Sequence, residues 1–201
     1  MSQATELTDD HLLRRMMDGD EEAFTQMYRR RQPPLYRFAL HMSGNTAIAE
    51  DVTQEVFMTL IRDLKRFDPA RGTLGGFLFG IARNHLRKRW AQEQRLVPLP
   101  EAAGEIYPQH SLGSQGGNGT GRSDDEYGAV ERAARLRQAI ATLPENYREA
   151  LVLCELQEMS YEAAAAALDC PIGTVRSRLH RARALLIEKL REAEAVRRVS
   201  A

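Results

Sequence analysis

Apolar residues recur at spacings of three and four positions along both halves of the chain, which is the spacing of one face of an α-helix. The pattern is clearest between Thr46 and Arg66. The predicted core positions of this helix are Ala49, Val52, Val56, Leu60 and Leu64. Its opposite arc is polar and mostly acidic, at Glu50, Asp51, Gln54 and Glu55. The pattern predicts an all-α fold.

Capping and helix-breaking residues divide the rest of the N-terminal half. Asp20 is a candidate N-cap for the first long helix, and Pro33-Pro34 breaks or kinks that helix before Gly44 ends it. Thr73 is a candidate N-cap for a later helix that continues to Trp90. Its outer face is basic and polar, with Arg83, Asn84, Arg87, Lys88 and Arg89.

This basic helix contains Gly75, Gly76 and Gly80. A glycine in an exposed helix interior costs up to about 1 kcal/mol relative to alanine. Packing must therefore supply the difference, or the start of the helix frays.

A composition change between about Leu96 and Gly128 predicts a flexible linker. Prolines are followed there by five glycines within residues 113–121, and such a stretch cannot bury enough apolar surface to offset its ordering entropy. A Gly/Ser-rich coil of about 30 residues has an r.m.s. span of about 30 Å. We therefore expect two small helical domains that can reach well-separated sites.

The C-terminal half predicts a helix-turn-helix. Ser160 is the candidate cap of a short alanine-rich helix that ends at Leu168, and a long helix follows from Ile172 to about Glu192. The buried stripe of the second helix is Val175, Leu179, Ala182 and Leu186. Short polar groups and guanidinium groups project from its other faces, which suits a helix in the major groove of DNA.

The charge distribution supports two anion-binding faces. Basic and acidic residues balance over the whole chain, but residues 62–95 carry nine basic and three acidic side chains, and residues 171–201 carry eight and three. Acidic segments precede both basic ones. This is the distribution expected of a nucleic-acid binder with two contact points. Solvated helix faces of mixed charge are the alternative interpretation.

Several functional classes lack support in the sequence. There is no phosphate-binding glycine loop, the histidines never pair at metal-ligand spacing, and Cys154 and Cys170 cannot form a tetrahedral zinc site. No membrane span or signal peptide is visible. We therefore expect a cytoplasmic protein that is not an enzyme and that needs no cofactor and no metal.

The motifs of both halves resemble those of one known family. The sequences AEDVTQEVF (49–57), FDP (67–69) and FLFGIARN (77–84) are similar to region 2 of the extracytoplasmic-function (ECF) sigma factors of the sigma-70 family. The sequences LPENYREAL (143–151), SYEAA (160–164) and GTVRSRLHRAR (173–183) are similar to region 4. The resemblance covers about residues 22–92 and 132–192.

The resemblance implies a role for each surface. Binding to the clamp helices of the largest catalytic subunit of core RNA polymerase is implied for Glu50, Asp51, Gln54 and Glu55. Reading and melting of the −10 promoter element is implied for Phe67, Arg71, Thr73, Phe77, Arg83, Asn84, Arg87 and Lys88. Binding of the −35 element is implied for Thr174, Arg176, Ser177, Arg178, His180 and Arg181.

The resemblance also implies an organisation and partners. A region 2 domain would occupy residues 1–95, a linker residues 96–130, a region 4 domain residues 131–192, and a tail residues 193–201. The protein would be a monomer when free, would direct core polymerase to promoter DNA, and would be controlled by an anti-sigma factor. It would not insert into a membrane. One departure from the family is Phe77, where tryptophan is usual; the aromatic ring is kept but the indole donor is lost.

Two alternatives remain open at this point. The first is a stand-alone regulator that uses only the C-terminal helix-turn-helix and binds duplex DNA without polymerase. The second is a protein that occupies polymerase without supporting initiation.

Overall fold

The computed structural model describes residues 7–96 and 124–199, and no strand occurs among them. The predicted all-α fold is confirmed. The α-helices are α1 (Asp9–Met17), α2 (Glu21–Ser43), α3 (Thr46–Arg62), α4 (Leu74–Leu96), α5 (Asp124–Ala141), α6 (Glu145–Leu151), α7 (Tyr161–Leu168) and α8 (Ile172–Val199). Short 3-10 turns cover Leu64–Arg66 (η1) and Pro69–Arg71 (η2), and a π-helical turn, η3, covers Val152–Leu156.

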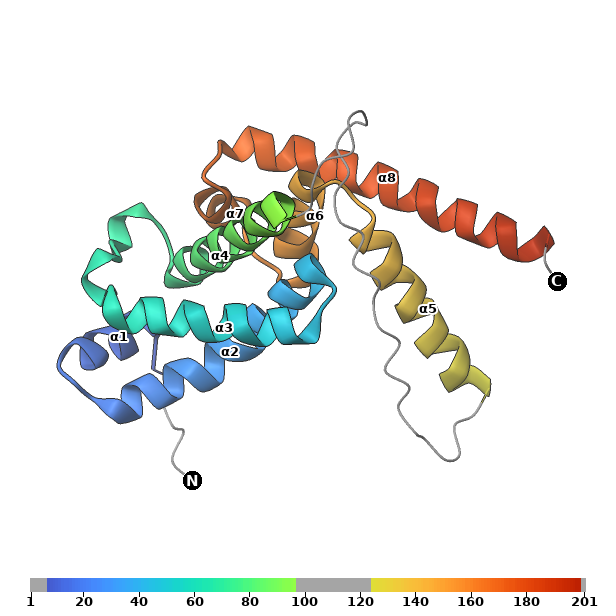
Figure 1. Cartoon of the computed structure of the whole chain (residues 1–201). Coiled ribbons are helices and arrows are strands. Elements are labelled where there is room, and N and C mark those ends of the chain that lie inside the picture. Colours follow the sequence, from blue (N-terminus) through green and yellow to red (C-terminus); the bar gives the residue numbers. More distant parts are fainter. Residues whose placement is uncertain (1–6, 97–123, 200–201) are drawn as a thin grey trace, which may run out of the picture.

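Helices α1 to α4 form an N-terminal bundle, drawn in blue to green in Figure 1. The predicted stripe of α3 lies in its core, where Ala49, Val56 and Leu60 have no exposed surface. Phe38 of α2 is equally buried, and its ring meets that of Phe79 in α4 edge-on, with 5.3 Å between centroids. The apolar periodicity therefore identified the core face of this bundle.

The capping residues act as the sequence predicts. The Asp20 carboxylate accepts hydrogen bonds from backbone N–H groups of the first turn of α2, and Gly44 ends this helix in the left-handed conformation with φ 66°. Thr73 Oγ1 accepts from the N–H of Gly76 at 3.1 Å, so it caps α4.

Two predicted features of the N-terminal helices differ from the structure. Helix α2 continues through Pro33-Pro34, so there is no break, although the two prolines lack backbone donors. Leu35 and Phe38, which follow them, are buried in the bundle and hold the segment in place. Helix α3 ends at Arg62 rather than Arg66, and the chain continues into η1.

The C-terminal half contains the predicted helix-turn-helix, formed by α7 and α8. Ser160 Oγ accepts from the N–H of Ala163 at 3.2 Å and caps α7. Asp169 makes the turn in the left-handed conformation, with φ 50°. Val175 and Leu179 of the predicted α8 stripe are buried.

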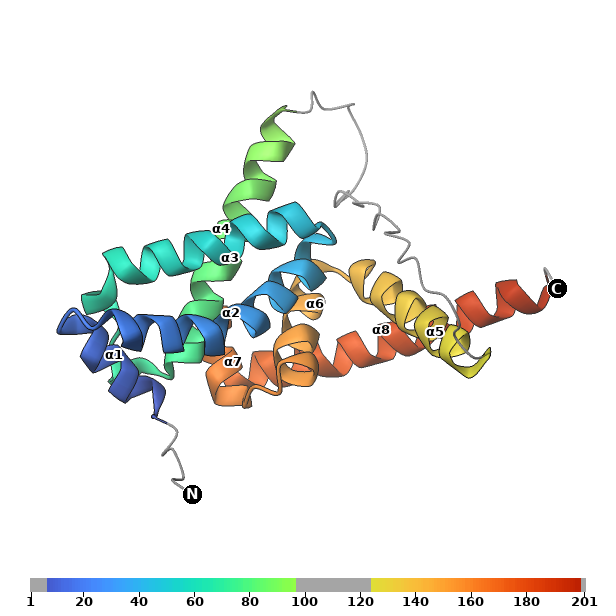
Figure 2. The ribbon, with the colours of Figure 1, turned by 90° about the horizontal axis from the view of Figure 1, so that it is seen from below.

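The helices next to the predicted linker and tail are longer than the sequence indicates. Helix α5 begins at Asp124, inside the stretch assigned to the linker, and α8 continues to Val199, past Glu192. Linker residues 97–123 lie outside the described residues. Figures 1 and 2 show α5 and α8 extending away from the N-terminal bundle, and in Figure 1 their far ends diverge.

The two halves of the chain pack against each other through α4 and α7, which lie side by side in Figures 1 and 2. A Cβ atom added at Gly76 would lie 3.1 Å from the carbonyl oxygen of Ala163, and one added at Gly80 would lie 3.5 Å from that of Ala167. The glycines of α4 therefore permit a close approach of the two helices. This contact provides the packing that the glycine content requires.

Candidate nucleic-acid and protein interfaces

The acidic arc, defined as Glu50, Asp51, Gln54 and Glu55, is exposed along α3, opposite the buried stripe. One member has a partner, because Asp51 Oδ2 lies 2.9 Å from Nη2 of Arg89 in α4. This ion pair is solvent-exposed, so it contributes little to stability and leaves the carboxylate available to another cation. The arc is thus an accessible anionic surface.

Exposed apolar residues continue this surface along α3. Met58 is 58% exposed and Ile61 is 49% exposed. They lie four and seven positions after Gln54, which places them on the same side of the helix. Met58 and Ile61 were not predicted as part of this surface, although their spacing from Gln54 in the sequence indicates it. A partner helix on this surface would meet acidic groups at one end and apolar groups at the other.

A groove of about 460 Å³ lies between α3 and α4. It brings together three of the residues predicted for −10 recognition, namely Phe77, Asn84 and Lys88. Its other lining residues, which the sequence analysis did not identify, are Thr59, Arg62, Asp63, Arg66, Ile81 and His85. The groove therefore combines an aromatic and an aliphatic side chain with amide, imidazole and cationic groups. It also contains the carboxylate of Asp63, whose Oδ2 lies 3.7 Å from Nε of Arg62 and 3.5 Å from Nη1 of Arg66. Such a set can hold a base and its phosphates.

His85 of α4 lines this groove and contacts α3. Its Nε2 lies 3.3 Å from Thr59 Oγ1. Burial lowers the pKa of His85, Glu55 opposes this shift, and Lys88 and Arg62 add to it. The imidazole is therefore kept neutral at physiological pH and can donate or accept a hydrogen bond inside the groove.

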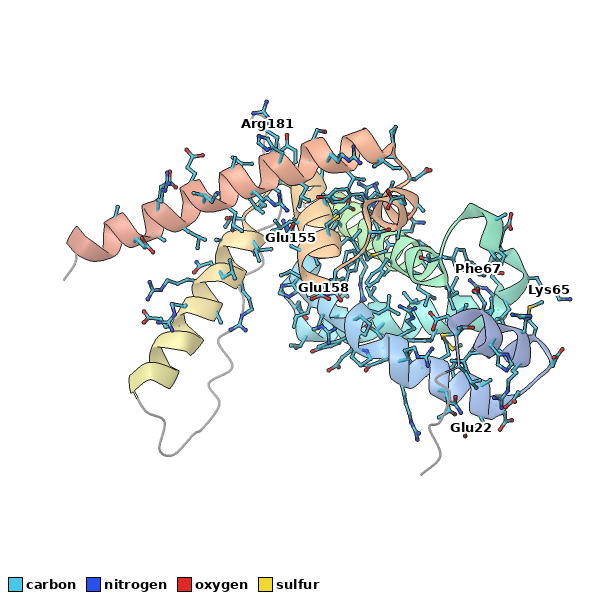
Figure 3. All side chains as sticks on the ribbon, turned by 180° about the vertical axis from the view of Figure 1, so that it is seen from behind. Glu22, Lys65, Phe67, Glu155, Glu158 and Arg181 are labelled. Carbon is cyan, nitrogen blue, oxygen red and sulfur yellow. The ribbon has the colours of Figure 1, made fainter. Side chains whose placement is uncertain are left out.

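Phe67 supports the groove from the connection between α3 and α4. Its ring lies 5.5 Å from that of Phe77, centroid to centroid. Phe67 is labelled in Figure 3, where it lies at the far end of the molecule from Arg181 of α8. The Thr73 hydroxyl is used as the cap of α4. The side chain of Arg71 lies outside the described residues.

Arg83 and Arg87, which the sequence places with Asn84 and Lys88 on the outer face of the basic helix, do not line the groove. Arg83 Nε donates to Oε1 of Glu149 at 2.7 Å, and Arg87 Nε donates to Oε1 of Glu145 at 2.7 Å. Residues four apart share a helix face, so Arg83 and Arg87 point together toward α6. The predicted −10 set is thus divided between two faces of α4.

Glu149 is a buried acid with no exposed surface. Burial raises its pKa, while the neighbouring Arg83 and Arg87 act in the opposite direction. Its second carboxylate oxygen, Oε2, has no hydrogen-bond partner among the described residues. The buried carboxylate of Glu149 therefore accepts hydrogen bonds on one oxygen only. This limits the contribution of its ion pair to stability.

The predicted −35 residues lie along the start of α8. Arg176, Ser177, His180 and Arg181 are exposed, and Thr174 and Arg178 are half-buried. Figure 3 shows Arg181 projecting from α8 away from the rest of the molecule. The guanidinium of Arg176 lies 5.7 Å from the centroid of the Tyr161 ring, which is a cation–π contact within the helix-turn-helix. The structure brings this predicted set onto one accessible helix.

Residues 7–96 and 124–199 contain neither a metal-binding cluster nor a membrane-spanning helix. No group of three or more His, Cys, Asp and Glu side chains is placed to hold a metal ion. In the same part of the chain, no helix has both the length and the apolar character needed to cross a lipid bilayer.

Comparison with known families matches the two halves separately. Residues 27–96 match Sigma-70 region 2, and residues 133–186 match Sigma-70, region 4. The first match contains the acidic arc and the groove, and the second contains the helix-turn-helix.

Individual relatives extend this result along most of the chain. The chain is 35% identical over 154 residues to the ECF RNA polymerase sigma factor EcfG of Rhodopseudomonas palustris, covering 77% of each protein. It is 32% identical over 179 residues to the ECF RNA polymerase sigma factor SigE of Mycolicibacterium smegmatis, covering 86% of this chain but 64% of that relative. It is also similar to the sigma factor RpoE of Bartonella quintana, solved in complex with the anti-sigma factor NepR. That similarity has a TM-score of 0.59 and 30% identity, and covers 84% of this chain and 96% of the other.

Proposed function

Because the chain belongs to the ECF RNA polymerase sigma factors of the sigma-70 family, we propose that it is an alternative sigma factor, which binds core RNA polymerase and directs promoter-specific initiation of transcription. The observation that carries this proposal is that regions 2 and 4 occur in order and that each presents its own accessible surface. The chain acts as a DNA-binding regulator and needs no catalytic site.

The acidic arc is the proposed contact with core polymerase. Its carboxylates and amide lie on one exposed face of α3, and an anionic face attracts a cationic partner and repels DNA. The clamp helices of the largest catalytic subunit are the partner that the family implies. Met58 and Ile61 extend the contact with apolar surface.

The groove between α3 and α4 is the proposed site of −10 recognition and melting. Phe77 offers a ring on which an unstacked base can lie, and Asn84 and the neutral His85 offer hydrogen bonds to a base edge. Lys88 supplies positive charge for the adjacent phosphates. Arg62 and Arg66 add to it, and their exposed ion pairs with Asp63 can exchange for phosphate contacts. Phe67 supports the Phe77 ring.

The start of α8 is the proposed reader of the −35 element. Arg176 and Arg181 can form bidentate hydrogen bonds with guanine edges, and Ser177 and His180 can approach bases or phosphates closely. The proposed division of labour places polymerase and −10 binding in residues 1–95 and −35 binding in residues 131–192. Residues 96–130 connect them, and residues 193–201 are a tail.

The proposed partners are core RNA polymerase, promoter DNA and an anti-sigma factor. The last is supported by the similarity to RpoE, which was solved with its anti-sigma factor. The chain is proposed to work in the cytoplasm, as a monomer when free of these partners. A stand-alone helix-turn-helix regulator is not favoured, because the matches extend over region 2 as well as region 4.

Run-off transcription tests the proposal. The purified chain is combined with bacterial core RNA polymerase on a pool of random promoter-like templates, and the transcript starts are sequenced. We expect transcripts that share two upstream elements at fixed spacing. Co-elution with core polymerase without transcripts would indicate a protein that only occupies polymerase. Binding to duplex DNA without co-elution would indicate a stand-alone regulator.

A further inference from the structure

The first residue of α7 borders the recognition helix α8. Tyr161 follows the cap Ser160, and the hydrogen bond from the N–H of Ala163 to Ser160 Oγ fixes this first turn. The Tyr161 ring is half-buried and packs against the hydrophobic core. A tyrosine side chain has only two torsions, so a ring that is packed in this way offers a rigid surface.

Two arginines of α8 lie beside this tyrosine. The Cζ atom of Arg176 is 5.7 Å from the centroid of the Tyr161 ring. Arg183 lies about two helical turns further along α8, and it pairs with Glu155 of η3. The hydrogen bond with Glu155 is the main cause that raises the pKa of Arg183, and the nearby Tyr161 hydroxyl acts in the same direction. Tyr161 therefore faces one arginine with its ring and another with its hydroxyl group.

An exposed acid next to Tyr161 offers Arg176 a different partner. The pKa of Glu162 is lowered, first by its own backbone N–H and the Ser160 hydroxyl, and to a smaller degree by the charge of Arg176. A guanidinium group that pairs with a carboxylate uses its N–H donors on that acid. A cation over an aromatic ring is attracted by the face of the ring instead, which leaves those donors free. The position of Arg176 over Tyr161 therefore keeps it available for another acceptor.

We propose that Tyr161 is a positioning residue for promoter reading, which holds the Arg176 guanidinium over its ring so that the N–H donors meet a base edge of the −35 element. The inference rests on the proposed role of α8 in −35 binding. Tyr161 acts through Arg176 and needs no contact of its own with a base.

Positioning of this kind acts on specificity more than on overall affinity. A bidentate hydrogen bond to a base edge requires one orientation of the guanidinium group. A phosphate contact carries no sequence information and depends mainly on charge, so it tolerates a mobile cation. An arginine that is already held also loses less rotamer freedom when it binds. Removal of the ring should therefore weaken the choice between base pairs and leave binding to unrelated duplexes almost unchanged.

The test uses the full chain bound to core RNA polymerase. The probes are fluorescein-labelled duplexes that carry the −35 element found by run-off transcription, either intact or with one base pair changed at a time. Discrimination is the ratio of the affinities for the intact and the changed duplex, measured by fluorescence anisotropy. Arg176→Ala first identifies the base pair whose discrimination depends on Arg176.

Three variants then separate the aromatic ring from its volume. Tyr161→Leu removes the aromatic face, whereas Tyr161→Phe keeps it. Tyr147→Leu makes the first change at another half-buried tyrosine, on α6. We expect Tyr161→Leu to lower discrimination at the Arg176 base pair about two- to fivefold, which is the factor for an exposed cation–π contact. Tyr161→Phe and Tyr147→Leu should both keep the wild-type value.

The double variant Arg176→Ala/Tyr161→Leu separates positioning from support of the fold. If Tyr161 acts through Arg176, the change at Tyr161 has no further effect on discrimination once the guanidinium group is absent. Circular dichroism and thermal unfolding establish that each variant keeps its helices.

Several results would overturn the proposal. Wild-type discrimination by Tyr161→Leu would show that the ring does not position Arg176. A loss of the same size in Tyr161→Phe, a further loss in the double variant, or a loss at every base pair together would show that Tyr161 acts by another route. Equal losses of affinity on all duplexes in Arg176→Ala would show that this arginine contacts only phosphates.

Failure of the proposed function has a different signature. A wild-type complex that binds intact and changed duplexes equally would overturn −35 reading by α8 itself, and this inference with it. Discrimination by the wild type that Tyr161→Leu leaves unaltered would overturn the positioning role of Tyr161 alone.

Discussion

Arg83 donates from Nε to Oε1 of Glu149 across 2.7 Å, although 66 positions separate the two residues along the chain. The contact joins the basic helix α4, in the region 2 match, to α6, in the region 4 match. An arginine to which the family resemblance gives a role at the −10 element is thus paired with an acid of the same chain. The two halves are thus coupled through arginines of α4 and carboxylates of α6.

Reversing the acidic arc is expected to abolish binding to core polymerase. The triple change Glu50→Lys, Asp51→Lys and Glu55→Lys places like charges opposite a basic partner, which costs several kcal/mol. The fold should persist, because all three side chains are exposed. Co-elution with core polymerase on gel filtration measures the effect. Glu188→Lys, exposed on α8, is the control, and unaltered binding of the triple variant would contradict the assignment of this surface.

Removing single arginines from the recognition helix should weaken −35 binding. We expect Arg176→Ala and Arg181→Ala each to cost about 1–3 kcal/mol on the preferred promoter if the side chain reads a base edge. Affinity for matched and mismatched −35 duplexes in the polymerase complex measures this, with Arg191→Ala, exposed further along α8, as the control. Equal losses on all sequences would instead mean that these arginines contact only phosphates.

The ring of Phe77 should matter for promoter melting more than its apolar volume does. Base–aromatic stacking contributes about 1–3 kcal/mol per base, so Phe77→Leu should reduce melting while it keeps an apolar contact with Phe67. Phe77→Trp should retain activity, because it keeps an aromatic surface. Permanganate reactivity of unpaired thymines at the −10 element is the measurement. Wild-type melting by Phe77→Leu would show that no base stacks on this ring.

The chain should lose stability as the pH falls below about 6.5, and His41 should account for part of this loss. Burial lowers the pKa of His41 from 6.5, and the charges of Arg137 and Arg37 lower it further. As the pH falls, His41 therefore takes up its proton in the unfolded chain before it does so in the folded chain. The contribution of neutral His41 to stability is complete above its pKa in the unfolded chain, and it is lost as the pH falls toward its pKa in the folded chain. The pKa of His85 is also lowered, so His85 contributes to stability in the same direction.

Urea unfolding at about pH 7.5 and about pH 5.5 tests this dependence. The free energy of unfolding of His41→Gln should change less between the two pH values than that of the wild type. An unchanged pH dependence in His41→Gln would contradict the prediction. Glu149 is present in both proteins, and its raised pKa changes stability with pH in the opposite direction. The difference in pH dependence between His41→Gln and the wild type therefore reports on His41 alone.

Local features of the fold could be predicted from the sequence because their causes are local. The period of α3 predicts its buried stripe, and Asp20, Gly44, Thr73 and Ser160 cap or end helices through contacts with their own neighbours. The exposed α8 face follows from the same periodicity. Helix lengths were less predictable: α2 continues through Pro33-Pro34 because its flanking residues are buried in a core that only the folded bundle creates.

The all-α fold, the acidic face of α3, the helix-turn-helix and the sigma-factor family can therefore all be read from the amino-acid pattern. The partners of the cations in α4 depend instead on how the helices pack. Asn84 and Lys88 line the groove with Arg62 and His85, whereas Arg83 and Arg87 meet Glu149 and Glu145. Helical periodicity predicts where each side chain lies around the axis of its helix. Which other helix packs on each face depends on contacts between residues far apart in sequence. Those contacts carry no local pattern to read.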